Sequence, residues 1–218
     1  MNTNIEQSIH EYEKSKKAFS GFMHNVIDFF GSDNNELFEN NRFAVHSLKF
    51  RLKDADHIKE KIIRKIQQGR SINPTNILSE ITDFCGVRVL HLKLSEFNTI
   101  HNAISNHIKN AHWVLAEPIK AYTWDPEYKQ YFEDRDISTE IKASFYTSVH
   151  YLVKPNSSSN ICCEIQVRTL FEEIWGEIDH ELNYPHPTGN IAQTEQLKVL
   201  AKLVGAGTKL VDSIYKSN

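Results

Sequence analysis

Cys163-Glu164-Ile165-Gln166-Val167-Arg168-Thr169 is the stretch around which the chain is organised. Side chains alternate along a strand, so Glu164, Gln166 and Arg168 point to one face and the two apolar residues between them point to the other. Apolar residues at helical spacing follow directly and predict an amphipathic helix from Leu170 to Asn183. Taken alone, the strand is most simply an edge strand with a solvated polar face. The rest of the chain decides whether this polar row is a site.

Composition sets the broad class of the protein. The 218 residues can bury a sizeable core as one domain. With 25 Lys+Arg against 28 Asp+Glu there is no general field for nucleic acid, so a polyanion site must be local. Cys85, Cys162 and Cys163 are odd in number and lack a Cys-x-x-Cys spacing, which is typical of reduced core residues. No apolar leader or membrane-length window occurs, which predicts a cytoplasmic protein without membrane contact.

Helices are predicted at both ends of the chain. Residues 1–44 form a helical segment, with an amphipathic helix from about Ile5 to Phe30 that ends at the polar run after Gly31. Residues 186–218 hold a last helix from about Gln193 to Tyr215, whose apolar face would dock on the sheet or on a second subunit. Residues 45–185 remain as the core of the domain.

The segment from Lys49 to Arg70 is the most lopsided in charge, with eight basic residues and three acidic ones. It fits a solvated helix face on which Glu60 pairs with Arg64 at i,i+4 spacing. It also fits a phosphate site, in which basic residues at the end of a strand and on the following helix converge. The residues concerned are Arg51, Lys53 and Lys61. The sequence leaves both interpretations open.

A buried strand is predicted from Val87 to Leu92, with Asp83 at its entrance. Asp83 is either a cap or a metal ligand, and its spacing alone favours the cap. A helix from Ser95 to Asn110, with Ser95 as its cap, and a strand from about Trp113 to Ile119 follow. Strand, helix and strand in this order make a crossover unit, which predicts a sheet covered by helices.

The segment from Tyr122 to Thr139 is polar and aromatic and is predicted to be a long mobile loop. The chain then passes into a strand that ends at Val153. A polar turn, Pro155 to Asn160, joins this strand to the one from Ile161 to Val167, which predicts a hairpin.

Four islands of residues, in this order, resemble the synthetase domain of the RelA/SpoT family over roughly Val45 to Pro185. They are Arg51-Leu52-Lys53 with Lys61, Asp83-Phe84-Cys85-Gly86-Val87-Arg88, Tyr146-Thr147-Ser148-Val149-His150, and Glu164-Ile165-Gln166-Val167-Arg168-Thr169 with its helix. The resemblance implies a nucleotidyltransferase-like α/β (α+β) fold, with a mixed sheet of about five strands flanked by helices. It implies a small alarmone synthetase that transfers the β,γ-pyrophosphate of ATP to the 3′-hydroxyl of GDP or GTP, makes (p)ppGpp and releases AMP.

The resemblance also implies roles for the donor residues. Asp83 and Glu164 match the two acidic positions of the family, as catalytic residues and ligands of Mg²⁺, and Glu164 matches an alternative role in deprotonating the acceptor hydroxyl. Planar guanidinium groups suit the faces of adenine, and ammonium groups suit its phosphates. Arg51 and Arg88 match the first role, and Lys53 and Lys61 match the second.

On the acceptor side, Tyr146 matches the tyrosine that stacks on the acceptor base. Lys142 and His150 match acceptor-phosphate or supporting positions, and Gln166 and Arg168 complete the strand motif as site support. The family also implies assembly through terminal helices, here a homo-oligomer, and a protein antidote (an antitoxin) or a partner hydrolase that limits toxicity. No motif of the family's own hydrolase domain occurs in this sequence.

Three residues depart from the family pattern. His57 replaces a usual serine, Phe145 replaces the usual glycine before the stacking tyrosine, and Thr147 replaces the usual arginine after it. The donor motifs are therefore nearly intact while the acceptor loop is altered. Toxic relatives use an adenine nucleotide or the 3′ end of a tRNA as acceptor, and both stay open here, as does a catalytically silent nucleotide-binding regulator. Weak overall charge argues against tRNA, although the Lys49–Arg70 segment could supply a local patch.

Overall fold

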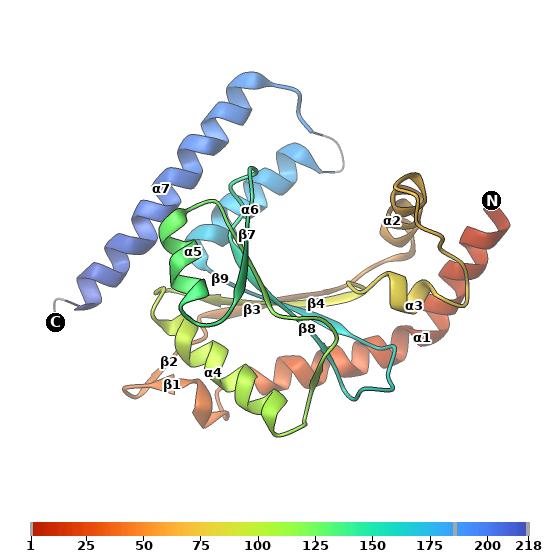
Figure 1. Ribbon diagram of the computed structural model, residues 1–218, viewed down its shortest axis with the longest axis horizontal. Coiled ribbons are helices and arrows are strands. Elements are labelled where there is room, and N and C mark those ends of the chain that lie inside the picture. The colour runs from red at the N-terminus through yellow and green to blue at the C-terminus, as the bar shows by residue number, and fades with distance from the viewer. Residues whose placement is uncertain (1, 185–186, 217–218) are drawn as a thin grey trace.

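The computed structural model describes residues 2–184 and 187–216, and it shows a curved sheet with helices on both faces (Figure 1). The predicted boundary between core and C-terminal segment, at residues 185 and 186, lies outside the described residues. Helices α1 and α4 cover one face of the sheet. Helices α6 and α7 stand on the other face at one end, and α2 stands at the opposite end.

Among the described residues, seven strands form one mixed sheet in the order β3-β4-β9-β8-β6-β7, with the short β5 paired to β8. Strand β9 pairs in parallel with β4 and antiparallel with β8, so it is a central strand and the edge-strand interpretation is wrong. The mixed sheet is confirmed, with more strands than the five or so predicted. The strands are β3 (Ser47–Leu52), β4 (Cys85–His91), β5 (Val114–Leu115), β6 (Lys120–Thr123), β7 (Ser138–Ile141), β8 (Ser148–Lys154) and β9 (Cys163–Thr169).

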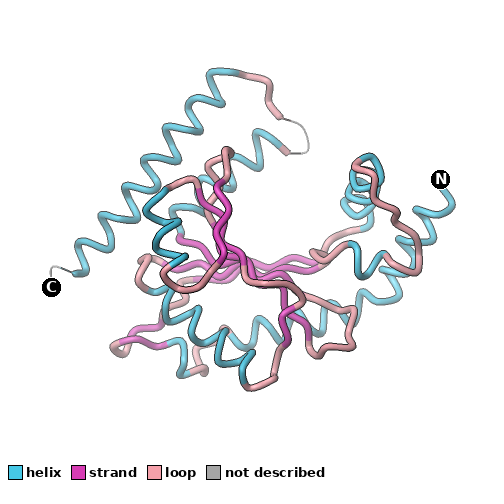
Figure 2. Tube along the Cα trace, viewed as in Figure 1, coloured by secondary structure: helices cyan, strands magenta, loops and turns pink. Residues whose placement is uncertain are grey.

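The helices follow the periodicity of the sequence closely at both ends of the chain (Figure 2). They are α1 (Asn2–Phe29), α2 (Ala55–Gln67), α3 (Ile77–Glu80), α4 (Glu96–Lys109), α5 (Pro126–Glu133), α6 (Leu170–Asn183) and α7 (Ile191–Lys216). A 3-10 turn, η1 (Asn35–Leu37), and a small hairpin, β1 (Phe38–Glu39) with β2 (Arg42–Phe43), complete the N-terminal segment. Helix α6 begins directly after β9 because Thr169 and Glu172 form a capping box.

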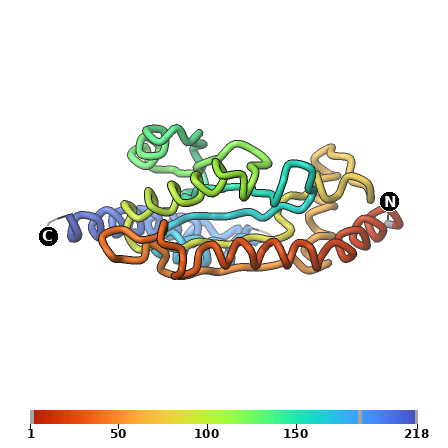
Figure 3. Tube along the Cα trace, turned by 90° about the horizontal axis from the view of Figure 1, so that it is seen from below, coloured from red at the N-terminus to blue at the C-terminus, as the bar shows by residue number. Residues whose placement is uncertain are grey.

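The apolar core lies between the sheet and the helices α1 and α4, and α1 runs along the long axis of the molecule (Figure 3). Tyr12 and Phe19 of α1 pack on Phe84, with ring centroids 4.7 Å and 5.0 Å from it. Ile165 and Val167 of β9 are fully buried on this side, as their alternation predicts. The three cysteines are buried and free, which confirms them as reduced core residues.

The strand predicted from Trp113 to Ile119 is wrong in its extent. Only Val114 and Leu115 pair with β8 before the chain leaves the sheet, and pairing resumes at Lys120 in β6. Pro118 lies in the gap, and a proline cannot donate to a sheet ladder. The crossover itself exists, because α4 connects β4 to the parallel-running β6 across two intervening strands.

The predicted long loop from Tyr122 to Thr139 is also wrong, since it contains helix α5 and the start of β7. Asp125 caps α5 by accepting the N–H of Glu127 at 2.8 Å, and Pro126 occupies the first turn. Tyr128 and Phe132 are buried beneath the helix. The charged residues that suggested a loop instead cap this helix, as Asp125 does, or lie on its exposed face.

Helix α4 starts where predicted but is not capped by the Ser95 side chain. The Ser95 N–H instead donates to Asp212 of α7 at 3.4 Å. Glu96 accepts the N–H groups of Leu92 and Lys93, and so closes the turn before the helix. The hairpin of β8 and β9 is confirmed. Within the described ranges, no helix is long and apolar enough to span a membrane.

Candidate functional site

A row of polar residues crosses the sheet face opposite α1. Register pairs Lys49 with Arg88, Arg88 with Gln166, Gln166 with His150, and His150 with Lys120. Residues in register share a face, so five strands contribute one side chain each to this row. Glu164 lies one step along β9, beside Gly86 of β4. Pairing therefore gathers polar residues from strands that are distant in sequence.

A cavity of about 290 Å³ lies over this face, bounded by β3, β4, β9 and α6. Five of the predicted site residues line it: Arg51, Asp83, Arg88, Glu164 and Gln166. The remaining lining residues are Lys49, Phe50, Gly86, Val87, Glu177 and His180.

Asp83 sits at the cavity end nearest α2, between two lysines. Lys53, just after β3, and Lys61, on α2, both pair with its carboxylate, Lys61 at 2.5 Å. Burial alone would raise the pKa of Asp83, but the two ammonium groups outweigh burial and lower that pKa to about 2. Burial lowers the pKa of Lys53 to about 8, against the attraction of Asp83. In the described chain Asp83 accepts no backbone N–H, so it is not a cap.

Two of the three basic residues proposed to converge on phosphates therefore meet at Asp83, while Arg51 lines the cavity beside them. No ion pair joins Glu60 to Arg64 in the part of the chain that the structure describes. The basic segment is consequently more than a solvated helix face.

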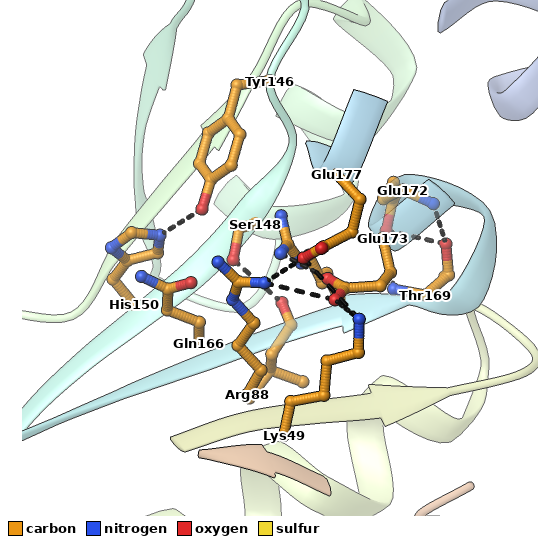
Figure 4. Close-up of polar contacts among 12 residues, drawn as sticks. Lys49, Arg88, Tyr146, Ser148, His150, Gln166, Thr169, Glu172, Glu173 and Glu177 are labelled. Atoms are coloured by element: carbon orange, nitrogen blue, oxygen red, sulfur yellow. Dashed lines mark hydrogen bonds and ion pairs between the residues drawn. The ribbon is translucent and has the colours of Figure 1, made fainter. Parts of the chain in front are cut away.

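Carboxylates of α6 hold the next cations of the polar row (Figure 4). Arg88 Nη1 lies 3.2 Å from Glu173 Oε1 and 2.5 Å from Glu177 Oε1, and Lys49 Nζ lies 2.8 Å from Glu173 Oε1. Sequence reasoning missed Lys49, Glu173 and Glu177. The signal was the i,i+4 spacing of the two glutamates, on a helix that begins where the polar strand ends.

Arg168 lies deeper than its role as site support suggested. Its side chain is only 3% exposed and pairs with the second oxygen of Glu173. A Cβ atom on Gly176 of α6 would lie 2.7 Å from Arg168 Nη1, so this glycine allows the helix to pack against the guanidinium. The Arg168 guanidinium carbon lies 5.8 Å from the centre of the Tyr146 ring.

A chain of hydrogen bonds links the other end of the site. His150 Nδ1 lies 3.1 Å from Glu164 Oε1. His150 Nε2 lies 2.9 Å from the Tyr146 hydroxyl, a bond that Figure 4 shows. Gln166 donates to the second Glu164 oxygen at 2.7 Å. Burial would raise the pKa of Glu164, but the His150 contact and the Gln166 hydrogen bond outweigh burial and lower it, so the carboxylate is ionised at neutral pH.

Lys142 lies farther from the cavity than the other predicted residues. It pairs with Glu140 at 2.5 Å, and its ammonium lies 4.5 Å from the centre of the Tyr122 ring. Tyr122 packs edge-on against His150, with centroids 4.8 Å apart. Sequence reasoning missed Tyr122 and Lys120, although their alternate positions were a signal for one face of a strand.

The three departures from the family pattern have structural partners. His57 pairs with Asp54 at 2.6 Å, and its ring centroid lies 6.4 Å from that of Tyr184. Thr147 is buried, with its hydroxyl 3.1 Å from that of Thr123. Phe145 has a backbone φ of +66°, in the left-handed region that glycine adopts most easily.

The oxygen donors in the cavity fit a hard divalent cation. Asp83 and Glu164 are both ionised and line the same cavity, and each disfavours the charge of the other. A cation between them would relieve that repulsion. No group of three or more potential metal ligands occurs among the described residues. Mg²⁺ nevertheless suits such a set, because it usually takes one or two carboxylates and completes its shell with phosphates and water.

Residues 50–189, more than half of the chain, match the family model described as "Region found in RelA / SpoT proteins". The chain belongs to the RelA/SpoT family. This family member is 35% identical over 72 residues to GTP pyrophosphokinase YjbM of Bacillus subtilis, a match that spans 31% of the chain and 34% of YjbM. It is 23% identical over 165 residues to GTP pyrophosphokinase YwaC of the same organism, which covers 73% of the chain and 68% of YwaC.

Solved structures show that this RelA/SpoT protein shares its fold with small synthetases. A GTP pyrophosphokinase family protein from Streptococcus pneumoniae matches with a TM-score of 0.72 at 21% identity, over 95% of this chain and 94% of that one. Small alarmone synthetase 1 from Bacillus subtilis, bound to its product pppGpp, matches with a TM-score of 0.71 at 18% identity, over 95% and 98% of the two chains. The predicted fold family is therefore confirmed.

Proposed function

We propose that this protein is an ATP-dependent pyrophosphokinase that transfers the β,γ-pyrophosphate of ATP to the 3′-hydroxyl of GDP or GTP, makes (p)ppGpp and releases AMP. One observation carries the proposal: two ionised carboxylates, Asp83 and Glu164, line one cavity between a cluster of cations and a chain of hydrogen bonds. Family membership and relatives named GTP pyrophosphokinase support it. Neighbouring structures bound to pppGpp and AMPCPP support nucleotide substrates.

The cationic end would bind the donor. Arg51 and Arg88 lie on adjacent strands and line the cavity, and planar guanidinium groups stack well on a purine. Lys53 and Lys61 would give up their ion pairs with Asp83 and bind the triphosphate instead, because its negative charge attracts both ammonium groups. This exchange would free Asp83 at the moment ATP binds.

Asp83 and Glu164 would hold Mg²⁺, as their charge and shared cavity support. The ion supplies charge neutralisation on the triphosphate and keeps it aligned for in-line attack. The side chains around the ion would hold the reacting groups in place. Two lysines hold Asp83 in the cavity until ATP binds, and His150 and Gln166 hold Glu164, so Glu164 enters the reaction already oriented.

The end of the site around Tyr146 would bind the acceptor. Tyr146 offers a ring for the acceptor base, and its hydroxyl is tied to His150, which in turn orients Glu164. Glu164 would accept the proton of the 3′-hydroxyl as that oxygen attacks the β-phosphorus of ATP. The bond from the β-phosphorus to the α,β-bridging oxygen breaks, and that oxygen leaves as part of AMP.

The altered acceptor loop supports a second candidate acceptor. Phe145 occupies a left-handed backbone conformation, and Thr147 is buried where the family pattern has an arginine. An adenine nucleotide or the 3′ end of a tRNA would keep the same donor chemistry with a different base on Tyr146. Homo-oligomerisation, an antitoxin or hydrolase partner, and the cytoplasmic location stay predictions.

Purified protein with γ-labelled ATP and Mg²⁺, offered GDP, GTP, ADP, AMP or bulk tRNA in separate reactions, tests the proposal. Label should move to GDP or GTP, with one AMP released for each transfer. Movement only to adenine nucleotides or tRNA would replace the acceptor and keep the reaction. ATP binding without AMP formation in every reaction would contradict the proposal and favour a silent nucleotide-binding regulator.

A further inference from the structure

Phe145 connects the acceptor loop to a distant part of the molecule. Its backbone φ of +66° is costly for a residue with a side chain, so the surroundings must compensate. The half-buried ring packs on Trp124, with centroids 5.0 Å apart. It also packs on a small apolar cluster made by Trp175 of α6 with Ala201 and Val204 of α7.

Helix α7 is firmly held at this place. Trp175 Nε1 donates to the Leu197 carbonyl oxygen at 3.0 Å, and Lys209 Nζ lies 2.9 Å from Asp125, the cap of α5. Helix α7 also passes close to Trp124 at Gly205, where a Cβ atom would lie 3.6 Å from that ring, in ordinary van der Waals contact. The Phe145 ring therefore packs on a surface whose position is fixed by the contacts of α7 with α6 and α5.

The residue after Phe145 is Tyr146, the proposed stacking partner of the acceptor base. Two hydrogen bonds hold the flanks of the loop to β6: the Lys142 N–H donates to the Thr123 carbonyl oxygen at 2.8 Å, and the hydroxyls of Thr123 and Thr147 lie 3.1 Å apart. Between these flanks, the Phe145 ring pins the loop to the α6–α7 cluster. Tyr146 also packs on this cluster, and its hydroxyl bonds to His150.

We propose that Phe145 is a positioning residue for acceptor binding, which fixes Tyr146 by docking on Trp124 and helix α7. The inference rests on the proposed function, because it assigns Tyr146 to the acceptor. It makes α7 part of acceptor recognition although α7 supplies no group to the reacting atoms. Lys53 follows the end of β3 and Lys61 lies on α2, which stands at the opposite end of the sheet from α7, so these two donor residues should not depend on this contact (Figure 1).

The KM values for acceptor and for ATP in four variants test the inference. Phe145→Ala should raise the acceptor KM by about tenfold or more and leave the ATP KM within about twofold, because misplaced binding groups cost affinity only for the ligand they hold. Val204→Ala, on the buried face of α7, should act in the same direction with a smaller effect. Phe145→Tyr should restore the wild-type acceptor KM. Leu203→Ala, on the exposed face of the same helix, is the matched control and should change neither value.

Equal changes in both KM values, or an unchanged acceptor KM in Phe145→Ala, would overturn the inference. A readout without turnover separates it from the proposed function. Hydrogen exchange of the backbone amides of residues 142–147 should be faster in Phe145→Ala than in wild type, while exchange in β3 and β4 stays the same. If the wild-type protein transfers no label but exchange of residues 142–147 is still faster in Phe145→Ala, the proposed function is wrong and the anchoring by Phe145 is kept. Unchanged exchange would overturn the anchoring whatever the activity.

Discussion

The two ends of the site are built from different chemistry. At the donor end opposite charges are paired: Asp83 lies between Lys53 and Lys61, and Arg88 lies against Glu173 and Glu177. At the acceptor end a single carboxylate, Glu164, is held by His150 and Gln166, and the Tyr146 hydroxyl bonds to His150.

The difference follows from what each end would bind. A triphosphate is recognised chiefly by charge. In the ligand-free protein, the partly buried cations that would bind it are paired with carboxylates, because an unpaired buried charge is costly. A base and a hydroxyl are recognised by stacking and directed hydrogen bonds, which need fixed geometry more than charge. The donor end should therefore respond to pH and charge substitutions, and the acceptor end to changes of shape.

Replacing the carboxylate shared by both ends should have the largest effect. Glu164→Gln keeps the size of the side chain but removes its charge and basicity, so transfer should fall by about 10²- to 10⁴-fold. The ATP affinity should stay close to that of wild type. Initial rates and equilibrium ATP binding measure the two effects, with Glu181→Gln on the exposed side of α6 as control. Wild-type transfer in Glu164→Gln would reduce Glu164 to a structural residue.

Asp83→Asn tests whether the donor end depends on the charge of this carboxylate and on Mg²⁺. The amide would leave Lys53 and Lys61 unneutralised and would bind Mg²⁺ poorly, so we expect transfer to fall by about 10²-fold. The Mg²⁺ concentration that gives half of the maximal rate should rise. Rates titrated with MgCl₂ measure this, and Asp56→Asn, an exposed aspartate on the same helix as Lys61, should behave as wild type. An unaltered Mg²⁺ response would place the ion elsewhere.

The pH dependence of ATP use tests the charge of the donor end. Burial lowers the Lys53 pKa to about 8, so the group is charged below that pH and loses its proton as the pH rises through it. The kcat/KM for ATP should therefore fall above pH 8, by about tenfold for each further pH unit. Lys53→Arg should remove this limb of the profile because arginine stays charged. A flat wild-type profile from about pH 7 to 9 would contradict the assignment.

The smallest expected effect concerns the exposed carboxylate beside Arg88. Glu177 is half-exposed, so its pair with Arg88 is weak, and Glu177→Gln should free the guanidinium for the purine. The Kd for ATP should fall by about two- to fivefold. Isothermal titration with a non-hydrolysable ATP analogue measures it. Glu181→Gln again serves as the control, and weaker binding in Glu177→Gln would mean that the carboxylate helps to hold Arg88 in its binding position.

Periodicity predicted the elements whose burial is one-sided. Helices α1, α6 and α7 and the β8–β9 hairpin appeared where apolar spacing placed them. Periodicity did not predict α5, because the segment is rich in charges and the buried face of the helix has only two aromatic residues. Asp125 and Pro126 start this helix. Periodicity also failed at Pro118, which interrupts a strand that composition alone made continuous.

The candidate site was predictable where one strand carries it and hidden where pairing creates it. Glu164 and Gln166 share a face by alternation, which needs no knowledge of neighbours. The contacts of Lys49 with Glu173 depend on β3 pairing with β4 and on α6 folding back over both, which no local pattern encodes. The same holds for Phe145, whose partners in α7 lie more than fifty residues away along the chain.

The most direct test of the central claim is the fate of each phosphate of ATP. With the acceptor that proves active, two parallel reactions should be run, one with ATP labelled at the α-phosphate and one with ATP labelled at the γ-phosphate, and the products separated by chromatography. A pyrophosphokinase leaves the α-label in AMP and moves the γ-label, with the β-phosphate, onto the acceptor in equal amount. An α-label found in ADP, or transfer of the γ-phosphate alone, would contradict pyrophosphate transfer at this site.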